Sequence, residues 1–267
     1  MAPRPRLVAS DLDGTLLDAR GAVSERTARS WSALEDAGIQ TVIVTARPPR
    51  WVEALAPIVG DHGIVLCANG AFVYDVAQRR MLQTHGLDPR AVSTLIADLR
   101  ARIPGITFGA ECADGFHRED AFPDGGVPGV VDQDPESIGP LNHVSSPVGK
   151  LLAQAPGMEA ERFRAAVEEV IGQRARLSVS CGDALAEIGP PQVTKAWALA
   201  QWASDRGIDA RKVWAFGDMP NDIPMLRWAG VGWAVANADP SVLAVADRVT
   251  GTNDEHGVAQ AIEPLLG

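Results

Sequence analysis

Short apolar runs alternate with amphipathic segments along the first part of the chain. The runs are nearly continuous and rich in β-branched residues, a pattern typical of strands covered on both faces. They are Arg6–Ser10, Ile39–Ala46, Ile64–Cys67 and Ala71–Tyr74. Between the first two runs, Ser24 predicts the N-cap of a helix that ends before Gly38. This alternation of strand and helix predicts a parallel α/β sheet.

The pattern changes after about residue 83 and returns near residue 194. Asp88-Pro89 predicts the start of a helix, and the segments after it predict strands separated by turns. A section rich in Gly, Pro and Asp, residues 121–140, predicts a loop. We therefore expect an α/β core formed by residues 1–84 and 188–267, interrupted by an inserted α+β domain at residues 85–187.

Composition and charge exclude some classes of partner. The 267 residues contain 24 Lys and Arg against 34 Asp and Glu, a net charge of −10. Because nonspecific nucleic-acid binding depends on cations placed at phosphates, we expect no nucleic-acid partner, although a local cluster of cations could hold a small phosphorylated molecule. No stretch approaches the roughly 18 apolar residues that span a bilayer, and the N-terminal segment has no apolar signal-peptide core. We expect a cytoplasmic protein without a membrane partner.

The cysteines offer no obvious metal or disulfide pattern. Cys67, Cys112 and Cys181 stand far apart, and no two of them form a CxxC pair. Reduced thiols packed in the core are the expected state of all three.

Candidate chemistry begins at the end of the first apolar run, in LVASDLDGTLL. Asp11 and Asp13 are two residues apart, so an extended backbone would direct both carboxylates to the same side, and Gly14 permits a tight turn after them. Open α/β sheets bind ligands at the carboxyl ends of their strands, where this pair must lie. The alternative is a pair of turn-forming acids that closes a strand.

Polar residues follow other predicted strands in the same way. Thr45 and Arg47 come after the second strand, where a hydroxyl and a guanidinium could bind a phosphate. Lys195 begins a helix, a position that is unfavourable for a cation unless an anion lies nearby. The simpler alternatives are a surface arginine and a solvated lysine.

A second group of acids follows the strand Val213–Phe216. Asp218, Asn221 and Asp222 occur in the segment GDMPND, and they could equally serve as turn and N-cap residues. Carboxylates that converge from separate strands form the oxygen-lined kind of site that Mg²⁺ prefers.

Taken together, these segments resemble the four motifs of the haloacid dehalogenase (HAD) superfamily of phosphohydrolases. DLDGT resembles the first motif, Thr45 the second, Lys195 the third and GDMPND the fourth. The segments ANGAFVYD, LAEIGPPQVTKAWAL, ANADPSVLAVADRVT and NDEHGVA resemble the Cof-type subclass, in which a large α/β cap is inserted between the second and third motifs. The departures are mild, namely Gln192 in place of a usual glycine and Pro224 inside the helix of the fourth motif.

The resemblance implies a Rossmann-like core and a role for each candidate residue. Asp11 would be the nucleophile that forms an aspartyl-phosphate, and Asp13 would protonate the leaving oxygen and later accept a proton from water. Mg²⁺ would be held by Asp11, the main-chain carbonyl of Asp13 and the side chain of Asp218. The remaining candidates would bind phosphate or support those that do: Thr45, Arg47, Lys195 and Asn221 as phosphate or substrate ligands, Gly14 through its backbone, and Asp222 by orienting Lys195 or a metal-bound water.

The inserted cap would close over the site and select the leaving group. Its candidate contacts are His117 and Arg118, placed in a turn, and Lys150, each of which could instead be a solvated loop residue. We expect a Mg²⁺-dependent phosphatase acting on a small phosphorylated metabolite, with sugar phosphates among the candidates. A phosphomutase of the phosphomannomutase type and a non-enzymatic phosphometabolite-binding regulator are the alternatives. The physiological substrate and the oligomeric state stay open.

Overall fold

The computed structural model describes residues 4–56, 63–123, 135–141, 144–178 and 185–267. The chain divides into two compact units, of which unit 1 comprises Met1–Leu82 and Thr194–Gly267 and unit 2 comprises Gln83–Val193. Part of the section predicted as a loop, residues 124–134, lies outside the described residues.

Unit 1 is built on an eight-stranded sheet with the order β14-β13-β12-β1-β2-β3-β4-β5. Its strands are β1 (Leu7–Ser10), β2 (Gln40–Val44), β3 (Ile64–Cys67), β4 (Phe72–Asp75), β5 (Arg80–Thr84), β12 (Val213–Gly217), β13 (Val231–Ala234) and β14 (Arg248–Val249). The six strands from β14 to β3 are parallel, and β3 pairs antiparallel with β4 across a turn that contains Asn69 and Gly70. The predicted parallel α/β core is confirmed.

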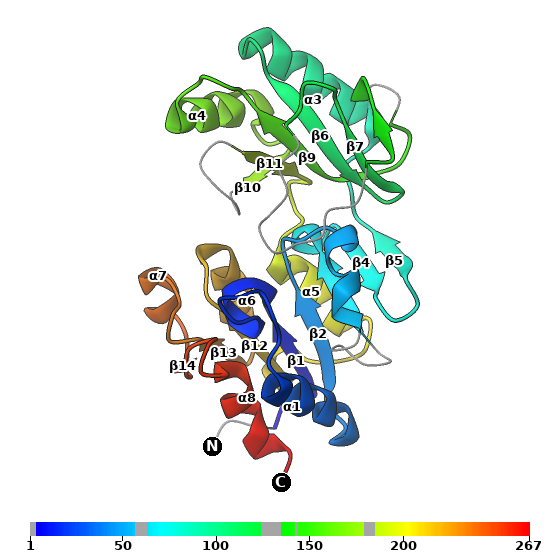
Figure 1. The fold of residues 1–267 in the computed structure, drawn as a ribbon. Coiled ribbons are helices and arrows are strands. Elements are labelled where there is room, and N and C mark those ends of the chain that lie inside the picture. Colours follow the sequence, from blue (N-terminus) through cyan, green and yellow to red (C-terminus); the bar gives the residue numbers. More distant parts are fainter. Residues whose placement is uncertain (1–3, 57–62, 124–134, 142–143, 179–184) are drawn as a thin grey trace. The chain divides into compact units, whose positions relative to one another are not determined.

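Helices cover the strands of unit 1, and every residue of β1 is buried. The α-helices among the described residues of unit 1 are α1 (Glu25–Asp36), α5 (Lys195–Ser204), α6 (Ile223–Trp228), α7 (Pro240–Leu243) and α8 (Gly257–Ile262), and Figure 1 shows α1 beside α8. The side chain of Ser24 caps α1 by accepting a hydrogen bond from the N–H of Thr27, as predicted, and Gly38 follows the helix at φ +74°. Because β1 lies in the middle of the sheet, the chain that follows it emerges between β2 and β12.

Unit 2 is a mostly antiparallel sheet packed against two helices. Its strand order is β10-β11-β9-β6-β7-β8. The elements are α3 (Pro89–Arg102), β6 (Thr107–Cys112), β7 (Gly115–Arg118), β8 (Ser137–Ile138), β9 (Val148–Gln154), α4 (Ala160–Ile171), β10 (Arg176–Ser178) and β11 (Ala186–Gly189). Among the described residues, no helix of either unit is long and apolar enough to cross a membrane.

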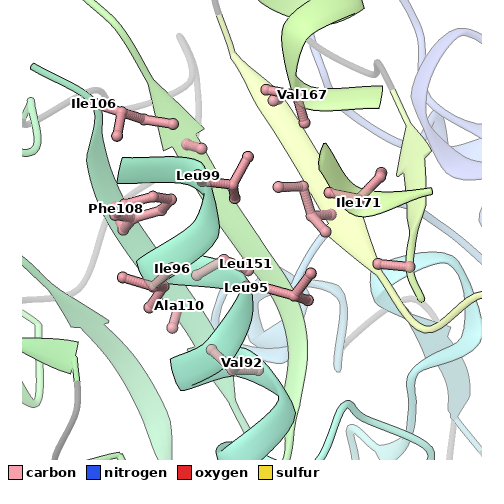
Figure 2. Close-up of a cluster of buried hydrophobic side chains, with 14 of the residues drawn as sticks. Val92, Leu95, Ile96, Leu99, Ile106, Phe108, Ala110, Leu151, Val167 and Ile171 are labelled. Atoms are coloured by element: carbon pink, nitrogen blue, oxygen red, sulfur yellow. The ribbon is translucent and has the colours of Figure 1, made fainter. Parts of the chain in front are cut away.

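The core of unit 2 lies between its helices and one face of its sheet. Figure 2 shows apolar side chains of α3 over the strands β6 and β9, and side chains of α4 belong to the same buried cluster. These side chains include Val92, Leu95, Ile96, Leu99, Phe108, Ala110, Leu151, Val167 and Ile171. On β6, Phe108 and Ala110 face this core, so the residues between and beside them point to the opposite face of the sheet.

One local prediction in unit 2 is wrong. His117 and Arg118 were expected in a turn, but they lie on strand β7. The turn is shorter than expected because it consists of Ala113 and Asp114, and the chain re-enters the sheet at Gly115, whose φ is +131°. A glycine tolerates this backbone conformation, which is strained for residues with a Cβ atom.

Candidate active site

The acid pair follows β1, but its two carboxylates occupy different environments. Asp11 is buried, and its N–H continues the ladder to β12 by donating to the carbonyl of Phe216 at 2.9 Å. Asp13 is exposed, because the backbone leaves the strand direction at Leu12 and turns. Gly14 makes this turn with φ +77°. The pair therefore presents one carboxylate inside the protein and one at its surface.

Lys195 is the buried cation of the site. It is the first residue of α5 and only 3% exposed, and its Nζ donates to Oδ1 of Asp11 at 2.6 Å and to Oδ1 of Asp222 at 2.7 Å. Burial alone would lower the pKa of the Lys195 ammonium, but the adjacent Asp11 and Asp222 carboxylates raise it above its ordinary value. The solvated-lysine alternative is wrong, since a buried lysine without partners would be strongly destabilising.

Asp222 connects Lys195 to the segment after β12. It is fully buried, and its Oδ2 accepts hydrogen bonds from the N–H groups of Asp218 and Met219, both at 3.1 Å. Its other oxygen accepts from Lys195. Gly217 permits this turn, because a Cβ atom there would lie 2.5 Å from Cβ of Asp222. Both oxygens of Asp222 thus have protein partners, which suits it to hold Lys195 in place.

Asp218 is buried beside the turn that follows β1. The hydroxyl of Thr15 donates to Oδ1 of Asp218 at 2.6 Å. Oδ2 lies so close to Gly14 that a Cβ atom at Gly14 would collide with it. Gly14 is therefore required twice, once for its positive φ and once for the approach of Asp218.

Three carboxylates gather around the single ammonium of Lys195. Oxygen atoms of Asp11, Asp218 and Asp222 lie within 4.8 Å of one another. Burial raises the pKa of Asp11 well above its ordinary value, an effect that Lys195 opposes and the two other carboxylates reinforce. Burial is also the main cause of the raised pKa of Asp218. A hard cation would compensate this excess of negative charge, and an all-oxygen donor set fits Mg²⁺.

Thr45 and Arg47 lie at the carboxyl end of the neighbouring strand β2. The hydroxyl oxygen of the buried Thr45 accepts a hydrogen bond from the N–H of Arg47 at 3.0 Å. The Arg47 guanidinium forms a two-bond fork with Asp13, with Nε to Oδ2 at 2.9 Å and Nη2 to Oδ1 at 2.5 Å. Arg47 is thus part of the site, where it binds the second acid of the pair. Asn221 is exposed on the turn Pro220–Asp222.

Two asparagines that were assigned no role support the turn after β1. Nδ2 of Asn237 donates to the carbonyl of Gly14 at 2.8 Å, and Nδ2 of Asn253 donates to the carbonyl of Leu17 at 2.9 Å. The N–H of Asn253 also donates to Oδ1 of Asn237 at 2.9 Å. Both asparagines occur in segments that carry the family resemblance, ANADPSV and NDEHGVA, and this was the signal that could have identified them.

The three candidate cap contacts lie on strands of unit 2. Arg118 is buried, and its Nη1 donates to the carbonyl of Phe122 at 3.0 Å. Lys150 is also buried and donates to Oε2 of Glu187 at 2.8 Å. His117 is partly exposed. The alternative of solvated loop side chains is wrong for Arg118 and Lys150.

Comparisons with known proteins agree over nearly the whole chain. A family model described as haloacid dehalogenase-like hydrolase matches residues 8–262. The 5-amino-6-(5-phospho-D-ribitylamino)uracil phosphatase YcsE of Bacillus subtilis is 28% identical over 262 residues, which cover 96% of this chain and 94% of that protein. The phosphatase YitU of the same organism, named for the same substrate, is 30% identical over 282 residues, 98% of each chain. A crystal structure of a haloacid dehalogenase-like hydrolase from Bacteroides thetaiotaomicron has a TM-score of 0.79 at 24% identity and covers 98% of this chain and 100% of its own. That structural likeness shows a shared fold.

Proposed function

The chain belongs to the haloacid dehalogenase-like hydrolase family, and from this premise we propose that it is a Mg²⁺-dependent phosphatase that forms an aspartyl-phosphate on Asp11. The predicted family and the predicted class of enzyme, a phosphoric monoester hydrolase, are confirmed by the family model and by the phosphatases among its relatives. The observation that carries the mechanistic proposal is the bridge that Lys195 forms between Asp11 and Asp222.

Asp11 is proposed as the nucleophile because it is fixed before the substrate arrives. Its backbone is held in the sheet, and one of its oxygens is held by Lys195. A carboxylate oxygen of Asp11 attacks phosphorus, the bond from phosphorus to the leaving oxygen breaks, and the phosphoryl group is transferred to Asp11. Carboxylates are weak nucleophiles, so most of the acceleration must come from alignment and from neutralised phosphate charge.

The metal would be held by Asp11, Asp218 and the main-chain carbonyl of Asp13. Bound there, Mg²⁺ supplies positive charge to the transferring phosphoryl oxygens. Asp222 is the poorest ligand of the acidic group because its oxygens already accept hydrogen bonds from Lys195 and two N–H groups. Its proposed role is to position Lys195, whose ammonium binds a phosphoryl oxygen together with the Thr45 hydroxyl.

Asp13 is proposed as the acid that protonates the leaving oxygen and then accepts a proton from the attacking water. Both oxygens of Asp13 accept hydrogen bonds from Arg47, so this fork must open before Asp13 can contact the leaving oxygen. We infer that the substrate phosphate competes with Asp13 for Arg47, because a guanidinium binds either oxyanion through the same fork. Phosphate binding would thereby release Asp13 beside the leaving group. Asn221 remains a proposed substrate contact.

The substrate is proposed to be a small phosphate monoester. Relatives named as 5-amino-6-(5-phospho-D-ribitylamino)uracil phosphatases suggest one member of the test panel, a ribityl phosphate, beside pentose and hexose phosphates. We also propose that residues 85–187 select among such esters, because sites of different specificity are commonly built on one catalytic fold.

The test is phosphate release from this panel in the presence of Mg²⁺. We expect release by the unaltered protein, none after EDTA, and none from Asp11→Asn. The exposed Asp36 provides a matched control, since Asp36→Asn makes the same chemical change on the surface of α1. Release that persists in Asp11→Asn, or no release from any ester, would contradict the proposal. Conversion of a hexose 1-phosphate into its 6-phosphate without free phosphate, followed by NMR, would identify a mutase.

A further inference from the structure

A second group of metal-ligating side chains lies in unit 2, at the turn of the hairpin formed by β6 and β7. Cys112, Asp114 and His117 each offer one ligand atom, and these atoms lie within 4.8 Å of one another. One thiol, one carboxylate and one imidazole form a donor set different from the carboxylates around Lys195. The phosphatase mechanism uses none of them.

The register of the hairpin explains why these residues meet. β6 and β7 pair antiparallel with Cys112 opposite Gly115 and Ala110 opposite His117. Side chains two residues apart on a strand share a face, so Cys112 and His117 are diagonal neighbours on one face. Asp114 belongs to the intervening turn and reaches back over the pair, with Oδ1 3.2 Å from Nε2 of His117.

The spacing suits a small tetrahedral ion. Metal–ligand bonds of about 2.0–2.1 Å to nitrogen and oxygen place two such ligands about 3.3 Å apart around a tetrahedral centre. The observed separation of 3.2 Å between His117 and Asp114 matches this geometry. Cys112 is 4% exposed, whereas the side chain of Asp114 is 53% exposed, so the group combines a buried sulfur atom with an open approach from solvent.

The imidazole of His117 is oriented by a residue from a third strand. Its Nδ1 lies 2.8 Å from Oγ of Ser137 on β8, which directs Nε2 toward Asp114. Metal-binding histidines commonly have their other ring nitrogen fixed by a hydrogen bond of this kind. The same ring could donate from Nε2 to Asp114 without any ion, so the experiment must detect the sulfur ligand.

We propose that Cys112, Asp114 and His117 bind Zn²⁺, with water in the fourth position, and that the ion fastens the β6–β7 hairpin. Mixed sulfur, nitrogen and oxygen ligands favour Zn²⁺ over Mg²⁺, which prefers oxygen alone. Binding replaces the proton of the Cys112 thiol, which is released to solvent as the zinc–sulfur bond forms. The carboxylates of unit 1 and the Cys112 group of unit 2 would therefore bind different cations.

Cobalt(II) is the probe, because a thiolate ligand gives it a charge-transfer band that an oxygen-only site lacks. Titration of the intact protein with Co²⁺ should give this near-ultraviolet band, together with visible bands of tetrahedral cobalt, and both should saturate as the Cys112 group fills. One equivalent of Zn²⁺ should abolish them. Asp218→Asn, which alters only the carboxylate group of unit 1, should keep the bands. Cys67→Ser is the matched thiol control, because Cys67 is buried in β3 outside the group.

Cys112→Ser should lose the charge-transfer band, and His117→Ala should bind Co²⁺ at least tenfold more weakly. Ser137→Ala should weaken binding by roughly tenfold, the usual effect of removing the hydrogen bond that orients a ligand. Far-UV circular dichroism of each variant establishes that it is folded. Absence of the band in the unaltered protein, or its persistence in Cys112→Ser, would overturn the proposal.

Discussion

Replacing Lys195 by Met tests whether the buried ion cluster depends on one ammonium. The substitution keeps much of the side-chain volume but removes the charge between Asp11 and Asp222. At separations of 2.6 and 2.7 Å and an effective dielectric constant of about 20, each contact has a gross Coulomb energy of about 6 kcal/mol. Most of this is offset by the cost of desolvating the charges. Breaking a buried pair typically destabilises a protein by about 3–5 kcal/mol, which is the loss we expect at pH 8.

The loss should depend on pH in a defined direction. Lys195 lowers the pKa of Asp11, so its removal leaves burial and the like charge of Asp222 to raise that pKa further. An acid whose pKa is raised in the folded state destabilises that state as the pH climbs from the unfolded pKa toward the folded one. The deficit of Lys195→Met should therefore grow between pH 5 and pH 8, by up to about 1.4 kcal/mol per pH unit while one carboxyl group holds its proton.

Urea denaturation in EDTA at several pH values measures this deficit, and EDTA keeps metal binding out of the comparison. Lys212→Met is the matched control, because Lys212 is exposed and its replacement should change the free energy of unfolding by less than about 0.5 kcal/mol. A deficit below about 1 kcal/mol, or one that is equal at pH 5 and pH 8, would refute the reasoning.

Three further substitutions test the packing around the site and the core of unit 2. Gly14→Ala should lower kcat by about 100-fold, because the new Cβ atom would displace Asp218. Gly21→Ala is the control, since Gly21 has a similar φ of +76° but open space around it, and it should leave kcat unchanged. Equal effects of the two substitutions would contradict the collision argument. Asn237→Ala removes the hydrogen bond to the Gly14 carbonyl, so it should lower the free energy of unfolding in urea by about 1–2 kcal/mol and also lower phosphatase activity. An unchanged kcat would show that the turn needs no such support. Phe163→Ala should destabilise unit 2 by about 3–5 kcal/mol, measured by denaturation, because the ring is buried in the core of that unit. A loss below about 1 kcal/mol would mean that the surrounding side chains close over the missing ring.

The convergence of Asp11 and Asp218 could be predicted from the sequence because it follows from a rule about sheets. Each acid follows an apolar run that predicts a strand, and the carboxyl ends of neighbouring parallel strands lie at the same edge of the sheet. Thr45 was placed by the same rule. Lys195 was harder, since its position at a helix start suggested an anion but did not identify which one. Its partner Asp11 is 184 residues away, a separation that no local pattern connects.

The contacts that could not be predicted are those made by ordinary residue types in turns. Asn237 and Asn253 hold backbone carbonyls of the turn after β1, yet an asparagine in a loop usually indicates only the loop itself. The fork between Arg47 and Asp13 depends on rotamers, which a sequence pattern does not specify. The Cys112 group was missed because the two-residue turn before Gly115, rather than sequence spacing, brings its members together.

The pairing of β1 with β12 has a consequence for synthesis of the protein. Ser10 lies opposite Phe216, so about two hundred further residues must be synthesised before β12, one of the two neighbours of β1, is available for pairing. At a typical rate of about 5–20 residues per second, this wait is on the order of 10–40 seconds on the ribosome. Unit 2 is one continuous stretch and can fold during that interval. Until β12 emerges, the N–H of Asp11 lacks its acceptor, the carbonyl of Phe216, and Asp218 and Asp222 have not yet been synthesised. The group of three buried carboxylates can therefore form only near the end of translation.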